Sequence, residues 1–90
     1  MVEIRKKCWP EFFEKILLGE KKFDLRLGDF DFCEGDILIL EEYNPLTGKY
    51  TGRKLKRKIG FILKTKELKF WTEDEIKKHG FVVLSLSDAE

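Results

Sequence analysis

Hydrophobic and polar residues alternate along several short stretches of the chain, and a period of two predicts β-strands. Residues 2–7 read VEIRKK, with apolar side chains set between charged ones. Residues 22–28 read KFDLRLG and alternate strictly, so we expect Phe23, Leu25 and Leu27 to face the interior. These two segments are therefore predicted strands with one buried and one charged face.

Three later segments are also predicted to be strands. Residues 36–43 read DILILEEY and are apolar on both faces, which is typical of a central strand. Residues 44–52 (NPLTGKYTG) contain proline and glycine and predict a hairpin that leads to a basic strand at 53–65. Residues 81–87 (FVVLSLS) complete the set as a buried final strand.

Two segments have the pattern of short helices. Residues 9–19 (WPEFFEKILLG) place Pro10 at the first helical position and Gly19 at the stop. Residues 72–80 (TEDEIKKHG) begin with a Thr-x-x-Glu capping box and end at a second glycine. The predicted element order is therefore β-α-β-β-β-α-β.

The predicted fold is mainly β with two short helices, in a single domain over residues 1–90. So little helix leaves one face of the sheet without cover. Curling of the sheet into a small pseudo-barrel of about five strands would remove its exposed edges.

Charge is segregated along the chain. Charged residues make up 39% of it, yet the formal net charge is only +1. Lysine and glutamate dominate and amides are scarce, a composition expected of a protein from a thermophile. Residues 24–42 contain seven acids and one base, whereas residues 49–69 contain nine bases and one acid. The basic segment favours a polyanion as partner, with a solvated face as the simpler alternative.

Metal-ligand spacing and targeting signals are not apparent. Neither cysteine lies at such a spacing, and the only histidine, His79, is distant from both. We expect no metal and no cofactor, and we expect Cys8 and Cys33 to be free thiols, with a disulfide between them as the alternative. No apolar run approaches the length of a membrane span, and residues 1–9 lack the apolar core of a signal peptide. We therefore expect a cytoplasmic protein without a membrane partner, and a monomer.

The segment GEKKFDLR at residues 19–26 resembles the G-x-K-x-x-E-x-R signature of the ASCH domain family. The likeness continues in the block FCEGDILILEEYNPLTGKYTGR and in the ending GFVVLSL, so that it covers nearly the whole chain. The chain resembles short, uncharacterised ASCH-type proteins of archaea and bacteria in particular. The resemblance implies a PUA-like barrel and a function in RNA binding.

The resemblance has a second implication, because some ASCH relatives are amidohydrolases that act on acetylated cytidine. Lys21 matches their lysine, but Asp24 stands where they have threonine and where the ASCH signature has glutamate. The favoured interpretation is a binding module for RNA or a nucleotide-like ligand. The alternatives are a nucleoside hydrolase that uses Lys21 and Asp24, and a module that binds a protein through its acidic and basic segments.

The charges of GEKKFDLR suit an anion site. Lys21 and Arg26 can bind phosphate while Asp24 orders them. The simpler alternative is that the cations follow a helix C-terminus, where the dipole stabilises them, and pair with the aspartate. We expect the cleft to lie between the first helix, the GEKKFDLR strand and the basic strand.

Three lysines share one face of the basic strand, and we call Lys54, Lys56 and Lys58 the lysine ladder. Alternate residues of a strand stand about 7 Å apart, close to the spacing of successive phosphates in an extended nucleic acid. The alternatives are a solvated face that discourages aggregation and pairing with the acids of residues 36–43.

The remaining candidates are an arginine, a tryptophan and a neighbouring lysine. By alternation, Arg57 lies on the face of its strand that carries the apolar residues. We therefore expect it to pair with an inward acid such as Glu41 or to line a pocket. Trp9, beside Lys7, can stack on an unpaired base, although aromatic residues are more often part of a core. The predicted binding residues are Lys7, Trp9, Lys21, Asp24, Arg26, Lys54, Lys56, Arg57 and Lys58.

Overall fold

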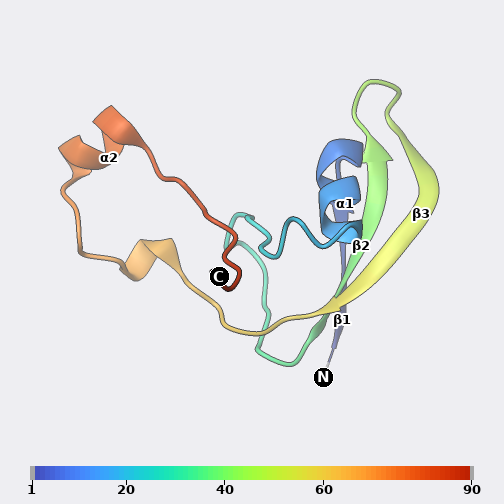
Figure 1. Cartoon of the computed structure of the whole chain (residues 1–90), viewed down its shortest axis with the longest axis horizontal. Coiled ribbons are helices and arrows are strands. Elements are labelled where there is room, and N and C mark those ends of the chain that lie inside the picture. The colour runs from blue at the N-terminus through green and yellow to red at the C-terminus, as the bar shows by residue number, and fades with distance from the viewer. Residues whose placement is uncertain (1, 90) are drawn as a thin grey trace.

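The computed structural model describes residues 2–89, which form a three-stranded sheet and two short helices (Figure 1). The elements in chain order are β1 (Glu3–Cys8), α1 (Pro10–Leu17), β2 (Ile37–Asn44), β3 (Lys49–Lys58), the 3-10 helix η1 (Thr65–Glu67) and α2 (Glu73–His79). The prediction of a small, mainly β fold with two short helices is confirmed.

β2 is the central strand of the sheet, as its apolar character on both faces predicts. β1 pairs with it in parallel and β3 pairs with it antiparallel. α1 lies in the crossover between β1 and β2 and returns the chain along the sheet, which makes this pair parallel. The predicted hairpin at residues 44–52 joins β2 to β3, where Gly48 takes a φ of 70°.

The core lies between α1 and one face of the sheet. Phe13 and Ile16 of α1 pack against side chains of all three strands. The buried members of this cluster are Cys8, Phe13, Ile16, Leu38, Leu40 and Leu55. Burial of one large apolar side chain stabilises a fold by roughly 1.5–3 kcal/mol relative to its exposure. This cluster therefore holds α1 on the sheet.

Both helices begin and end where the sequence predicts. Pro10 occupies the first turn of α1, and Gly19 beyond its end has a φ of 80°, a value that favours glycine. α2 opens with a reciprocal capping box, in which Thr72 accepts a hydrogen bond from the amide of Glu75 and the Glu75 carboxylate accepts one from the amide of Thr72. Gly80 follows α2 with a φ of 67°.

Asp36 fixes the entry into β2. Its buried carboxylate accepts hydrogen bonds from the backbone amides of Val2 at 3.0 Å and Cys33 at 2.8 Å. These donors stabilise the anion and lower the pKa of the Asp36 carboxyl group below its usual range. The turn before β2 is thereby tied to the chain just before β1.

The five-strand barrel expected from the sequence is not confirmed. Within residues 2–89, segments 22–28 and 81–87 contain no strand, and β3 ends at Lys58. Leu25 and Leu27 were expected to face the interior, but they are 70% and 79% exposed. Alternation determines which side chains share a face, but that face is buried only where a second layer covers it.

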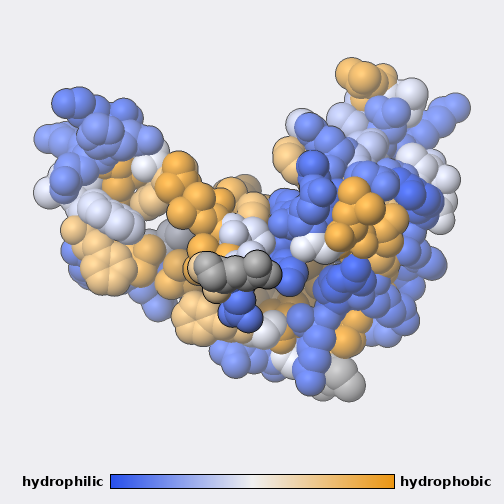
Figure 2. Space-filling model, in the orientation of Figure 1, coloured by the Kyte–Doolittle hydropathy of each residue, from blue (hydrophilic) through white to orange (hydrophobic). Residues whose placement is uncertain are grey.

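Apolar side chains in the last third of the chain are exposed as well. They include Phe61, Leu63, Phe70, Val82, Leu84 and Leu86. Figure 2 shows hydrophobic residues gathered around the middle of the molecule, between the sheet and α2, which lies away from the sheet in Figure 1. The backbone amide of Lys22 donates to the hydroxyl of Ser85 at 3.1 Å, so segments 22–28 and 81–87 lie close together.

Candidate functional site

Alternate residues of the three strands form a charged surface on the side of the sheet away from α1, which we call the outer face. Its members are Glu3, Arg5 and Lys7 of β1, Ile37, Ile39 and Glu41 of β2, and Lys54, Lys56 and Lys58 of β3. All five cations are exposed, and only two acids lie among them. Ile39 is buried between Arg5 and Lys56, its register partners, whose aliphatic stems can cover it.

Two ion pairs cross the outer face, and each joins β1 to another strand. Arg5 Nη1 lies 3.6 Å from Glu41 Oε2, and Lys56 Nζ lies 3.2 Å from Glu3 Oε2. Exposed pairs of this kind are screened by solvent and contribute little to stability. The other two lysines of the ladder have no ion-pair partner among residues 2–89. Positive charge therefore remains in excess along β3.

Arg57 lies on the opposite side of the sheet from the lysine ladder. Its register partner is Leu38 of the core, whereas Glu41 belongs to the outer face and binds Arg5. The expected pair between Arg57 and Glu41 is therefore wrong, because strand alternation places the two side chains on different faces. Arg57 is exposed instead, and its Nη1 donates to the carbonyl of Lys56 at 2.9 Å.

Aromatic residues lie at the end of the outer face where β1 and β2 finish. Lys7 Nζ lies 4.2 Å from the ring centroid of Tyr43 and 6.0 Å from that of Tyr50. The two tyrosine rings meet edge to face with their centroids 5.1 Å apart. Trp9 follows β1, is 50% exposed and stacks on Phe12 of α1, with the ring centroids 6.3 Å apart. Lys7 and Trp9 thus lie at an end of the sheet that is rich in aromatic rings.

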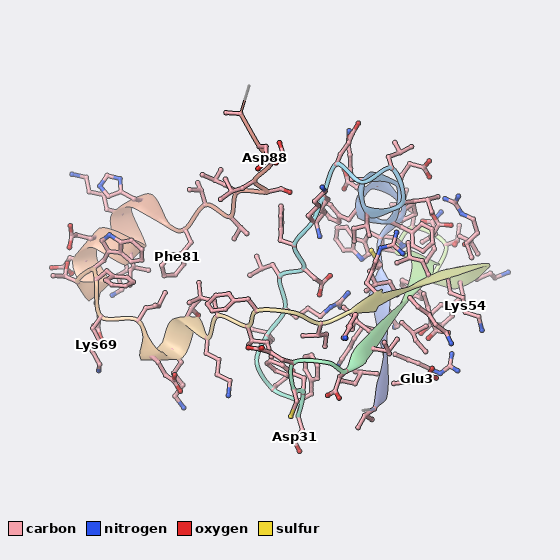
Figure 3. All side chains as sticks on the ribbon, turned by 60° about the horizontal axis from the view of Figure 1, so that its bottom comes forward. Glu3, Asp31, Lys54, Lys69, Phe81 and Asp88 are labelled. Atoms are coloured by element: carbon pink, nitrogen blue, oxygen red, sulfur yellow. The ribbon has the colours of Figure 1, made fainter. Side chains whose placement is uncertain are left out.

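A hollow of about 350 Å³ opens beside Trp9, between the start of α1 and the β2–β3 hairpin. Its lining residues are Trp9, Pro10, Glu11, Asn44, Pro45 and Leu46. A second hollow of about 470 Å³ lies beside α2, around Trp71 and Phe81. Figure 3 places Phe81 at the other side of the molecule from Lys54 and Glu3. Of the predicted binding residues, Trp9 alone lines either of these two hollows.

Arg26 connects the GEKKFDLR segment to β1. Its Nε donates to Asp24 Oδ2 at 2.6 Å, and its Nη2 donates to the carbonyl of Lys7 at 2.9 Å. Both side chains of the Asp24–Arg26 pair are 23% exposed. Lys21 Nζ donates to the carbonyl of Phe23 at 2.8 Å and lies 4.6 Å from its ring centroid. Asp24 therefore orients Arg26, and Arg26 holds the segment against the end of β1.

Cys8 lies close to these charges. Burial is the largest effect and raises the pKa of its thiol. Lys21 and Arg26 lower this pKa to a smaller extent, and Asp24 raises it. Both cysteines are free thiols, as expected, although Cys33 is exposed. The side chains of Lys21 and Asp24 are each hydrogen-bonded to another group of the chain. Catalysis by these two residues stays a prediction.

An ion-pair network centred on Glu42 was missed in the sequence. Glu42 is 4% exposed and accepts hydrogen bonds from Arg53 Nε at 2.9 Å, Arg53 Nη2 at 3.0 Å and the Thr51 hydroxyl at 2.5 Å. Arg53 also donates to Glu14 at 3.0 Å and lies 4.9 Å from the Phe13 ring centroid. The hydrogen bonds from Arg53 and Thr51 lower the pKa of Glu42, and the two carboxylates raise the pKa of Arg53.

An irregularity in the pairing of β2 with β3 makes this network possible. The register shifts between Glu41 and Tyr43, so β3 has extra residues opposite Glu42. Gly52, with a φ of 93°, separates the two β3 residues that bind the carboxylate. Two signals in the sequence were available. Glu42 alternates with the core leucines of its strand and so shares their face, and Gly52 interrupts a basic strand.

The structure brings some predicted residues together and keeps others apart. Arg26 contacts the carbonyl of Lys7 at the end of β1, and Trp9 follows directly after this strand. The lysine ladder lies on the other side of β2 from β1, so the structure does not place it beside the GEKKFDLR segment in one cleft as expected. The physical reason is that β2 pairs with both β1 and β3 and so lies between them.

Within residues 2–89, no group of three or more His, Cys, Asp or Glu side chains is placed to hold a metal ion. No helix in the same range has the length and apolar character that a membrane crossing requires.

Comparisons with known proteins give a family but no activity. A family model described as "Domain of unknown function (DUF3850)" matches residues 5–86. The "Uncharacterized 12.9 kDa protein in GpA 3'region" of Escherichia phage P2 is 33% identical over 73 residues. The alignment covers 81% of this chain and 62% of the phage protein, so the chain spans about three fifths of that relative's length. No solved structure matches the chain.

Proposed function

This chain belongs to the Domain of unknown function (DUF3850) family, and we propose that it is a binding module for RNA or a nucleotide-like ligand. The observation that supports the proposal most is the outer face, where Arg5, Lys7 and the lysine ladder are exposed beside only two acids. Alternate residues of β3 repeat at about 7 Å, near the spacing of phosphates in an extended strand. Such contacts give affinity for nucleic acid without reading its sequence.

The GEKKFDLR segment extends this basic surface beyond β1. Arg26 reaches the carbonyl of Lys7 and is oriented by Asp24, an arrangement that suits a phosphate ligand. Lys21 lies on the same segment and is the second proposed phosphate ligand. The relation to the ASCH domains is part of the same proposal, because those PUA-like domains often bind RNA.

A mixture of short single-stranded RNAs is expected to bind at low salt, and the affinity is expected to fall steeply as salt rises. If about four phosphates are neutralised, the logarithm of the association constant should fall against the logarithm of salt concentration with a slope near −3. Filter binding over a series of salt concentrations measures this slope. Lack of retention at the lowest salt concentration would rule out the proposed function.

We further propose that residues 22–28 and 81–87 pair as strands in solution and complete a barrel of about five strands. Residues 22–28 alternate apolar with polar residues and residues 81–87 begin with an apolar run, and closure would cover Leu25, Leu27 and the apolar side chains of the last third of the chain. The hydrogen bond between the Lys22 amide and Ser85 provides a starting contact.

Hydrogen exchange tests this closure directly. The backbone amides of residues 22–28 and 81–87 are expected to exchange within about tenfold of the rate of β2 amides, because strand pairing protects both. Amides of α2 serve as an internal reference for the part of the chain outside the sheet. Exchange of both segments at the rate of an unstructured peptide would contradict closure.

A further inference from the structure

The hollow beside Trp9 lies where a strand bound on the outer face would leave the sheet. It is an open hollow of about 350 Å³. Tyr43 precedes Asn44 of its lining, and Lys7 lies over the Tyr43 ring on the outer face. Lys7 can therefore bind the phosphate next to a base that enters the hollow.

Trp9 provides a stacking platform in this hollow. Its ring lies at 21° to that of Phe12, with centroids 6.3 Å apart, so the indole is supported from one side. Half of its surface nevertheless remains exposed. An indole that is both supported and accessible is the kind of surface on which an unpaired base stacks.

Two polar side chains of the lining have unused hydrogen-bonding capacity. Glu11 lies in the first turn of α1, where the helix dipole favours its anion, and it has no ion-pair partner among residues 2–89. Asn44 Oδ1 accepts the backbone amide of Leu46 at 2.9 Å. The Asn44 amide nitrogen keeps its two hydrogens free among the same residues, so the hollow offers a two-oxygen acceptor and a neutral donor.

We infer that this hollow is a specificity pocket for one unpaired guanine of a bound RNA strand, an inference that rests on the function proposed above. The Watson–Crick edge of guanine presents two adjacent donors, N1–H and the N2 amino group, beside the O6 acceptor. The Glu11 carboxylate can accept both donors and the Asn44 amide can donate to O6. Adenine, cytosine and uracil each present no more than one donor group on that edge.

The pocket is tested by measuring the affinity of four RNA strands by fluorescence anisotropy. Each strand is an oligouridine about nine nucleotides long, and the central base is G, A, C or U. The strand with one guanine is expected to bind about tenfold more tightly than the other three. Glu11→Gln should bring all four affinities within about twofold, because an amide presents a donor to guanine where the carboxylate had an acceptor. Trp9→Ala should weaken all four strands about tenfold.

Matched controls come from the other half of the chain. Glu73→Gln changes the first residue of α2, and Trp71→Ala removes a tryptophan that is also 50% exposed. Both variants are expected to keep the wild-type affinities and the guanine preference. Equal affinity of the wild type for all four strands would overturn the pocket and leave RNA binding intact. A guanine preference that survives Glu11→Gln would also overturn it, whereas absence of binding by every strand at low salt would refute the proposed function itself.

Discussion

Arg53→Met is expected to lower the midpoint of thermal unfolding by about 10 °C at pH 7. The substitution leaves Glu42, which is 4% exposed, with Thr51 as its remaining hydrogen-bond donor. A buried carboxylate without its cation is strongly destabilising, and Arg53 also binds Glu14 of α1. Arg57→Met removes the same charge from the same strand but breaks only a bond to a backbone carbonyl, so it should have little effect.

The pH dependence of the stability lost in Arg53→Met shows whether the Glu42 carboxylate causes that loss. In the wild type the pKa of Glu42 is lowered, so its contribution to stability is present above the unfolded value of about 4.3 and is lost as pH falls through the folded value. In Arg53→Met, the hydrogen bonds and the charge of Arg53 no longer lower the pKa of Glu42, so the carboxylate is protonated at a higher pH than in the wild type. The difference in stability between wild type and variant should therefore be largest near neutral pH and shrink toward pH 4.

Chemical denaturation at several pH values measures this difference. The double variant Glu42→Gln, Arg53→Met removes the unpaired charge and should recover most of the stability lost at pH 7. A loss that is the same at every pH, or that the double variant does not recover, would show that Arg53 acts through packing on Phe13 instead.

Local patterns predicted the elements whose stabilising contacts are close in sequence. Pro10 and Gly19 marked α1, and the Thr72–Glu75 pair marked the start of α2, because caps are made by neighbouring residues. The central position of β2 was also predicted, because apolar residues on both faces are typical of a strand in the middle of a sheet. The strands expected at residues 22–28 and 81–87 depend on a distant partner, which a local hydrophobic pattern alone does not identify.

The candidate site was only partly predictable for the same reason. Parity correctly placed the lysine ladder on one face, but the partner of Lys56 is Glu3 of β1, a strand that is not adjacent to β3. The pairing of Arg53 with Glu42 depends on a register shift, and the hollow beside Trp9 depends on how α1 meets the hairpin. Each of these requires the pairing of strands to be known first.

Neutralisation of the lysine ladder is expected to weaken RNA binding about 100-fold at about 0.1 M salt. Each phosphate contact contributes about 0.7 to the slope of log affinity against log salt, and hence about fivefold in affinity between 1 M and 0.1 M. Loss of three contacts should therefore also reduce the slope from near −3 to about −0.7. The variant carries the substitutions Lys54→Gln, Lys56→Gln and Lys58→Gln.

A control with the same change in net charge separates the outer face from overall electrostatics. It carries Lys66→Gln, Lys69→Gln and Lys77→Gln, and all three lysines are exposed. Figure 3 shows Lys69 at the opposite side of the molecule from Lys54. The control should keep nearly all of the affinity and the slope, because screening over about 10 Å removes the influence of distant charges. Equal losses in the two variants would mean that the ladder is an ordinary solvated face and that RNA, if bound, lies elsewhere.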